Sequence, residues 1–87
     1  MPYIKQEDRG RATPMLADVR TAGELNYAIS VLLCEYVDRH GLCYETLNAA
    51  VGAVDGAKAE FQRRVVAPYE DRKISENGDV YYFEELQ

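Results

Sequence analysis

The residues best suited to chemistry are one histidine and two cysteines that lie close together in the sequence. Cys34, His40 and Cys43 have the spacing Cys-x5-His-x2-Cys. A structural zinc site uses four ligands, whereas these residues supply three at irregular spacing. A nucleophilic cysteine needs an adjacent base, and His40 is the only histidine. Near the end of a predicted helix, His40 is better interpreted as a cation favoured by the helix dipole. We therefore expect no catalytic residue, no metal site, no cofactor and no enzymatic activity.

The best candidate for binding a ligand or a partner is the segment RRVVAPYED, residues 63–71. Two guanidinium groups suit planar recognition of phosphate or carboxylate, and the tyrosine ring that follows can stack on a base. Alternatively, the arginines pair with Glu60 and with the two acidic residues after the tyrosine, and stabilise a corner. Tyrosines near the C-terminus add contact surface. The predicted ligand or partner contacts are Arg63, Arg64, Tyr69, Tyr81 and Tyr82.

Length and charge restrict the classes of partner. The 87 residues allow one domain, residues 1–87, with a modest core that needs a supplement such as self-association. A net charge of −5 argues against binding duplex nucleic acid. No apolar run approaches the roughly 18 residues of a membrane span. Two cysteines without a signal peptide ahead of them predict free thiols in a reducing cytosol.

The clearest local signal begins a helix predicted from Thr21 to His40. Thr21-Ala22-Gly23-Glu24 fits a capping box, and Gly41 suits the position after the last helical residue. Apolar residues at three- and four-residue spacing predict a core face. These residues are Leu25, Ala28, Ile29, Leu32, Leu33 and Tyr36. Tyr27, Val31 and Cys34 lie roughly opposite, so this helix is expected to have contacts on two sides.

A second long helix is predicted from about Tyr44 to Val66, with a bulky apolar stripe and a stripe of small residues on its far side. The bulky residues are Leu47, Val51, Val54, Phe61 and Val65; the small ones are Ala49, Gly52, Ala53, Gly56 and Ala59. Each glycine inside a helix costs about 1 kcal/mol relative to alanine, so two of them suggest a close approach of another backbone. That backbone is either the helix Thr21–His40 of the same chain or a second copy.

An antiparallel crossing of two copies about Val54 is self-complementary, as a two-fold interface must be. It would place Gly52 opposite Gly56, Ala49 opposite Ala59 and Glu45 opposite Arg63. The protein is therefore predicted to be a homo-oligomer, either a dimer or a multiple of two. The predicted self-association residues are Glu45, Ala49, Gly52, Gly56, Ala59, Arg63, Tyr27 and Val31.

The remaining segments predict shorter elements. Thr13-Pro14 suggests a helix over residues 15–20. Pro68 is expected to end the second long helix and to start a short one from Tyr69 to about Glu76. Residues 80–83, VYYF, have strand propensity and are expected to pair with residues 2–4. The predicted fold is mainly α: two long packed helices, one or two short helices and a short two-stranded ribbon that joins the termini.

The stretches MPYIKQEDR, GELNYAISVLL and AKAEFQRRVVAPYEDRKISENGDVY resemble a family of short uncharacterised proteins encoded by bacteriophages and bacteria. The resemblance covers most of the chain and implies a small accessory protein in a bacterial cytoplasm, with no assigned catalytic residue. The family commonly has serine where this chain has Cys43. Two functions follow as hypotheses: a self-associating module that binds a host protein, or an oligomer that sequesters a nucleotide-like signalling ligand and so counteracts host defence.

Overall fold

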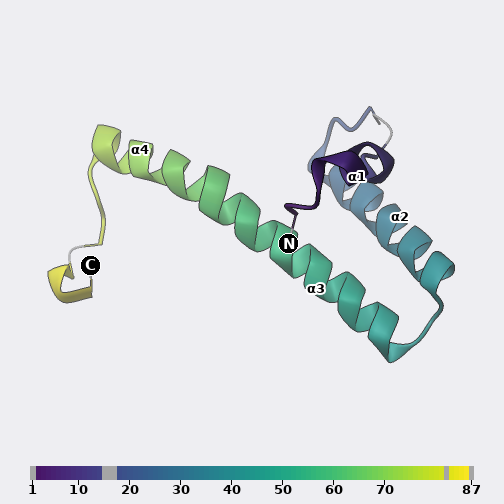
Figure 1. Cartoon of the computed structure of the whole chain (residues 1–87). Coiled ribbons are helices and arrows are strands. Elements are labelled where there is room, and N and C mark those ends of the chain that lie inside the picture. Colours follow the sequence, from purple (N-terminus) through teal and green to yellow (C-terminus); the bar gives the residue numbers. More distant parts are fainter. Residues whose placement is uncertain (1, 15–17, 82, 87) are drawn as a thin grey trace.

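The computed structural model describes residues 2–14, 18–81 and 83–86, and Figure 1 shows that helices dominate them. The α-helices are α1 (Gln6–Ala12), α2 (Ala22–His40), α3 (Tyr44–Phe61) and α4 (Ala67–Asn77). A π-helical turn, η1 (Gln62–Val66), joins α3 to α4, and a short 3-10 helix, η2 (Glu84–Leu86), lies near the C-terminus. The prediction of a mainly helical fold is confirmed.

Both predicted ends of α2 are confirmed. The Thr21 hydroxyl accepts a hydrogen bond from the Glu24 backbone N–H at 3.0 Å. The Glu24 carboxylate in turn accepts one from the Arg20 N–H at 2.7 Å, one residue before the expected donor. At the other end Gly41 has φ of 98°, and its N–H donates to the Val37 carbonyl at 2.7 Å. A positive φ is natural for glycine, which has no Cβ to clash. Local sequence therefore fixes the limits of this helix.

The predicted break at Pro68 is wrong, because α3, η1 and α4 form one continuous helix from Tyr44 to Asn77. Proline cannot donate the hydrogen bond of a helical turn, and its ring crowds the carbonyl of the preceding turn. The π turn directly before it widens the helix, and the Ala67 N–H donates to the Gln62 carbonyl. Ala67 keeps right-handed helical angles, with φ of −61° and ψ of −48°. The proline is thus accommodated by a local change of helical register.

Two further expectations fail. The helix near the N-terminus is α1, so Thr13 caps a helix end rather than a helix start, and residues 18–20 are not helical. Residues 15–17 of the predicted short helix lie outside the described part of the chain. No strand occurs among the described residues, and the ribbon between residues 2–4 and 80–83 is not formed. The long helix carries the C-terminal segment away from the N-terminal one (Figure 1).

The chain is extended and has almost no core. Helices α2 and α3 pack against each other, whereas α4 projects away from both (Figure 1). The radius of gyration is 17.5 Å, compared with about 12 Å for a compact domain of this length. Among the described residues, Ala50 and Thr46 alone are buried, and both lie on α3. One chain therefore leaves most of its apolar side chains open to solvent.

Candidate functional site

An apolar groove lies between α2 and α3, with a volume of about 460 Å³. Its apolar floor comes from α2 and α3 in similar measure, and its rim carries two carboxylates, Asp38 and Asp55. The lining residues are Leu33, Cys34, Val37, Asp38, Leu47, Ala50, Val51, Val54 and Asp55. Within the described part of the chain, neither rim carboxylate has an ion-pair partner. A surface of this kind suits an apolar segment that carries positive charge.

The groove is continuous with an exposed stripe on the long helix, which we call the long-helix stripe. It consists of Leu47, Val51, Val54, Phe61, Val65 and Tyr69. Every member is exposed, from 37% for Val54 to 61% for Val51. With Lys58 filling the one gap, the intervals alternate between three and four residues over most of the stripe, which is the spacing of a helix-pairing seam. The bulky apolar stripe predicted for the second long helix contains all of these residues except Tyr69.

A second apolar face, the α2 stripe, consists of Leu25, Ile29, Leu32 and Tyr36. Its members are 40–54% exposed, and the intervals of four, three and four residues again suit pairing with a helix or a groove. The predicted core face of α2 is therefore open for most of its length. The chain presents two apolar faces on two different helices. Each is a contiguous row of apolar side chains, whereas the apolar residues of an ordinary protein surface are scattered singly.

Helix α2 does not cross the stripe of small residues on α3 at Gly52. A Cβ built on Gly52 would meet no atom within 4 Å, and Ala49 and Ala59 are exposed. Gly56 is half-buried. The interpretation that α2 of the same chain crosses closely at Gly52 is wrong, because α2 packs on the side of α3 that carries Thr46 and Ala50. Contact of this stripe, and of exposed Glu45, with a second copy stays a prediction.

The two predicted contacts on α2 lie beside a second depression. Tyr27 is 71% exposed and Val31 is half-buried. The depression has a volume of about 560 Å³ and separates this part of α2 from the segment that precedes it. Its lining residues are Pro14, Asp18, Val19, Glu24, Tyr27, Ala28, Val31, Leu32 and Glu35. Leu32 belongs to both this depression and the α2 stripe, so the two surfaces are contiguous.

Arg63 is engaged within the chain. Its Nε and Nη2 donate to the two carboxylate oxygens of Glu60, each at 2.9 Å. The Tyr3 hydroxyl donates to the same carboxylate at 2.6 Å. The hydrogen bonds from Arg63 and then from Tyr3 lower the pKa of Glu60 from 4.5 to about 2. The alternative interpretation is thus confirmed for Arg63 with Glu60 alone. Among the described residues neither arginine pairs with Glu70 or Asp71, and the expected corner is absent because the helix is continuous.

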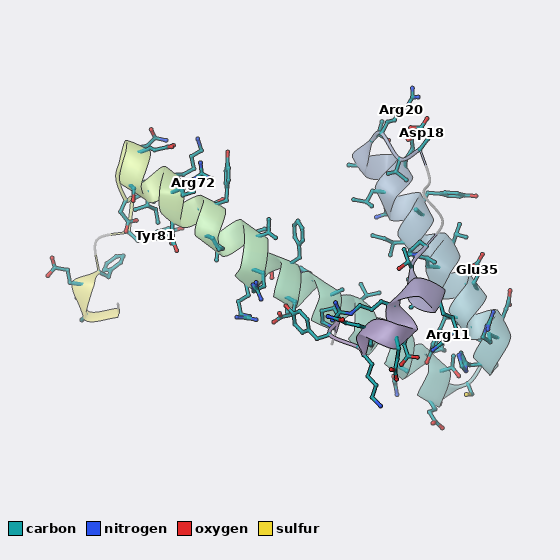
Figure 2. All side chains as sticks on the ribbon, turned by 45° about the horizontal axis from the view of Figure 1, so that its top comes forward. Arg11, Asp18, Arg20, Glu35, Arg72 and Tyr81 are labelled. Carbon is teal, nitrogen blue, oxygen red and sulfur yellow. The ribbon has the colours of Figure 1, made fainter. Side chains whose placement is uncertain are left out.

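The other predicted contacts are not brought together into one site. Arg64 has no ion pair within the described part of the chain, and Tyr69 is 53% exposed with the Lys73 ammonium 5.5 Å from its ring centre. Tyr81 is 71% exposed and lies beyond the end of α4 (Figure 2). Tyr82 lies outside the described residues. The arginines and the C-terminal tyrosines therefore do not form a pocket in one chain.

The cysteine and histidine residues do not converge on a metal centre. No cluster of metal-ligating side chains occurs among the described residues. The His40 ring lies against Tyr36 with ring centres 4.4 Å apart. The Cys43 sulfur lies 3.4 Å from the Thr46 hydroxyl oxygen, and this contact together with the Thr46 backbone lowers the pKa of the thiol. Cys43 is thus tied to the first turn of α3 rather than to His40.

Sequence reasoning missed the contact of Tyr3 with Glu60, which joins the N-terminal segment to the middle of the long helix. The two residues are 57 positions apart, and no local pattern predicts such a pair. The view in Figure 2, turned by 45°, agrees with Figure 1 that the N-terminal segment lies beside α3.

A family model described as a domain of unknown function (DUF6899) matches residues 1–80, which is nearly the whole chain. No curated protein and no solved structure matches the sequence. Across the described residues, no helix combines the length and the apolar character that crossing a membrane requires.

Proposed function

Since the chain belongs to the DUF6899 family, we propose that it is a small non-enzymatic protein that works as an oligomer and binds another protein. In the setting that its resemblance to bacteriophage and bacterial proteins implies, that partner is a protein of the bacterial host. Each of the two exposed stripes has a separate part in this proposal. One stripe joins copies of the chain, and the other stays available to the partner.

The observation that carries this proposal is the area of exposed surface. One chain exposes 8222 Å². A compact monomer of 9.9 kDa exposes about 5,200 Å². The excess of about 3,000 Å² per chain is as large as the area that obligate oligomers bury, and it exceeds that of a standard single interface. Burying apolar area is the main stabilising term in folding, and an isolated chain lacks about a third of the surface burial expected of a compact monomer.

Sedimentation equilibrium of the purified protein tests self-association directly. We expect a mass that is a multiple of two of the 9.9 kDa chain at low micromolar concentration. We also expect loss of helical signal when dilution drives dissociation, because folding and association are coupled in such chains. A well-folded monomer at all concentrations would overturn the proposal.

The α2 stripe is the face that we assign to the partner protein. Leu25→Lys should abolish capture of the partner from a bacterial extract while the oligomeric mass is kept. Asn26→Lys is the matched control, since it places the same charge on the adjacent, exposed position away from the stripe. Equal capture by both variants would contradict this assignment.

Sequestering a nucleotide-like ligand is the second candidate function. It is favoured by Arg64, whose guanidinium group forms no ion pair among the described residues, and by the exposed ring of Tyr69 on the same part of the helix. A guanidinium group and an aromatic ring are the groups that bind phosphate and base. Binding would raise the Tm in a screen of nucleotides and cyclic dinucleotides, and Arg64→Ala should remove the rise. A flat response across the screen would exclude this candidate.

A further inference from the structure

Residues 62–77, formed by η1 and α4, extend the long helix past the part of it that packs against α2; we call them the overhang. α4 contacts η1, the turn that precedes it, but it does not pack against α1 or α2. Helix propensity alone gives a helix little stability in water, and tertiary packing of an apolar face normally supplies most of it. The overhang carries such a face, with Val65 51% exposed and Tyr69 53% exposed. Its helical structure therefore calls for a covering surface.

We propose that the covering surface is the α2–α3 groove of a second copy, with the two long helices antiparallel and each overhang seated in the other chain's groove. This inference rests on the proposed oligomer and names the surface through which it forms. The groove is mainly apolar and is continuous with the long-helix stripe, with which it shares Leu47, Val51 and Val54. A two-fold axis exchanges the two overhangs, so both grooves and both overhangs are covered at once.

Charge complementarity supports this occupant. The groove rim carries Asp38 and Asp55, whereas the overhang carries Arg64 and Arg72, and none of the four has an ion pair within the described part of the chain. Figure 2 shows Arg72 on α4, far from α2 of its own chain. A parallel arrangement would instead set Arg64 beside Arg64 of the other copy, a like-charge contact that is unfavourable. Antiparallel pairing brings opposite charges together.

The residue spacing is consistent with one such axis, placed between Ala59 and Glu60. A two-fold axis at this point, with the two long helices antiparallel, puts Val54 opposite Val65 of the second copy and Leu47 opposite Arg72. It also puts Lys58, the one polar interruption of the stripe, opposite Phe61, where an ammonium group can lie over an aromatic ring. Because α2 contributes Asp38 near the Leu47 end of the groove, Arg72 of the second copy lies close to that carboxylate in this arrangement. Apolar and charged positions are thus matched by a single alignment.

The area involved is adequate for a stable dimer. Obligate dimers bury about 2,000–5,000 Å² in total, or half of that for each chain. The excess exposed area of about 3,000 Å² per chain covers this requirement and leaves area for the α2 stripe. A second copy therefore accounts for the long-helix stripe without using the face assigned to the partner protein.

A charge-exchange experiment tests the arrangement. Arg72→Asp and Asp38→Arg should each raise the dimer Kd about tenfold, since each places like charges together twice in a symmetric dimer. The double variant should recover most of the wild-type affinity. Glu35→Arg is the control for Asp38→Arg, because Glu35 lies on α2 beside the other depression and outside the groove. This control should leave the Kd unchanged.

The outcomes separate this inference from the proposed function. A monomeric wild-type protein would overturn both. An oligomer whose Kd is unchanged by Arg72→Asp and Asp38→Arg would overturn the groove as the interface and leave the oligomer intact. Weakening by each single variant without recovery in the double variant would overturn the pairing of Asp38 with Arg72. Circular dichroism at high concentration verifies that each variant is helical.

Discussion

Tyr3 donates its phenolic hydroxyl to the carboxylate of Glu60 at 2.6 Å, and this contact holds the N-terminal segment against the middle of the long helix. The same carboxylate accepts two hydrogen bonds from Arg63. Three hydrogen bonds to one carboxylate favour its ionised form, so the contact between the two parts of the chain weakens when Glu60 is protonated. The contact is therefore sensitive to pH.

We predict that the N-terminal segment is released in acid. The pKa of Glu60 is lowered from 4.5 to about 2 in the folded chain. A lowered pKa contributes stability that is complete above the unfolded value and is lost as pH falls from about 4.5 to about 2. Hydrogen exchange of residues 2–12, measured at a series of pH values between about 2 and 5, checks this window.

Glu60→Gln is the matched variant for that experiment. It keeps the shape of the side chain but removes the charge, so its N-terminal segment should be mobile at neutral pH and insensitive to acid in this window. Tyr3→Phe should leave the pairing with Arg63 in place and release only the N-terminal segment. Identical pH profiles for the wild type and Glu60→Gln would show that another group is responsible.

Local signals predicted the helix ends well, because capping depends on a few adjacent residues. Thr21 with Glu24 begins α2 and Gly41 follows its last residue, as expected, and Gly78, with φ of 92°, follows the last residue of α4. The prediction of a break at Pro68 is wrong because a π turn, which has no clear sequence signature, accommodates the proline within the helix. The apolar stripes were recognised by their spacing, but spacing does not say whether a face is covered by the same chain or by another.

Replacing Gly52 by alanine tests whether the stripe of small residues on α3 is open at this position or is approached closely by a second copy. The site is helical and open, and an added Cβ meets no neighbour, so Gly52→Ala should stabilise the protein by about 1 kcal/mol through helix propensity. Thermal unfolding and sedimentation measure this together, and we expect an unchanged mass. A loss of stability or of oligomer would show instead that a second copy approaches closely at Gly52, as the sequence alone suggested.

Pro68→Ala tests whether the π turn is a consequence of the proline. Alanine restores the missing N–H and removes the clash, so η1 should convert to regular α-helix, with a gain of about 1–3 kcal/mol in helix stability. Slower hydrogen exchange over residues 62–72 would report the conversion. Ser75→Ala, on the exposed surface of α4, is the control, because it shows how much any substitution to alanine raises helix propensity. Persistence of the π turn in the variant would mean that packing, rather than proline, maintains it.

The two native cysteines report whether the groove is covered. Cys34 lines the groove, whereas Cys43 lies outside it at the start of α3, where contact with Thr46 lowers the pKa of its thiol. A lowered pKa increases the thiolate fraction, so Cys43 should be alkylated readily at pH 7.5 in every assembly state.

Cys34 should be protected in the wild-type oligomer by the seated overhang and should become at least several-fold more reactive in Val51→Asp, which places a charge in the groove. Mass spectrometry of alkylated peptides distinguishes the two sites, and Asn48→Asp, on the same helix but outside the lining of the groove, is the matched control. Rapid modification of Cys34 in the intact oligomer would show that the groove is open and that the copies meet elsewhere.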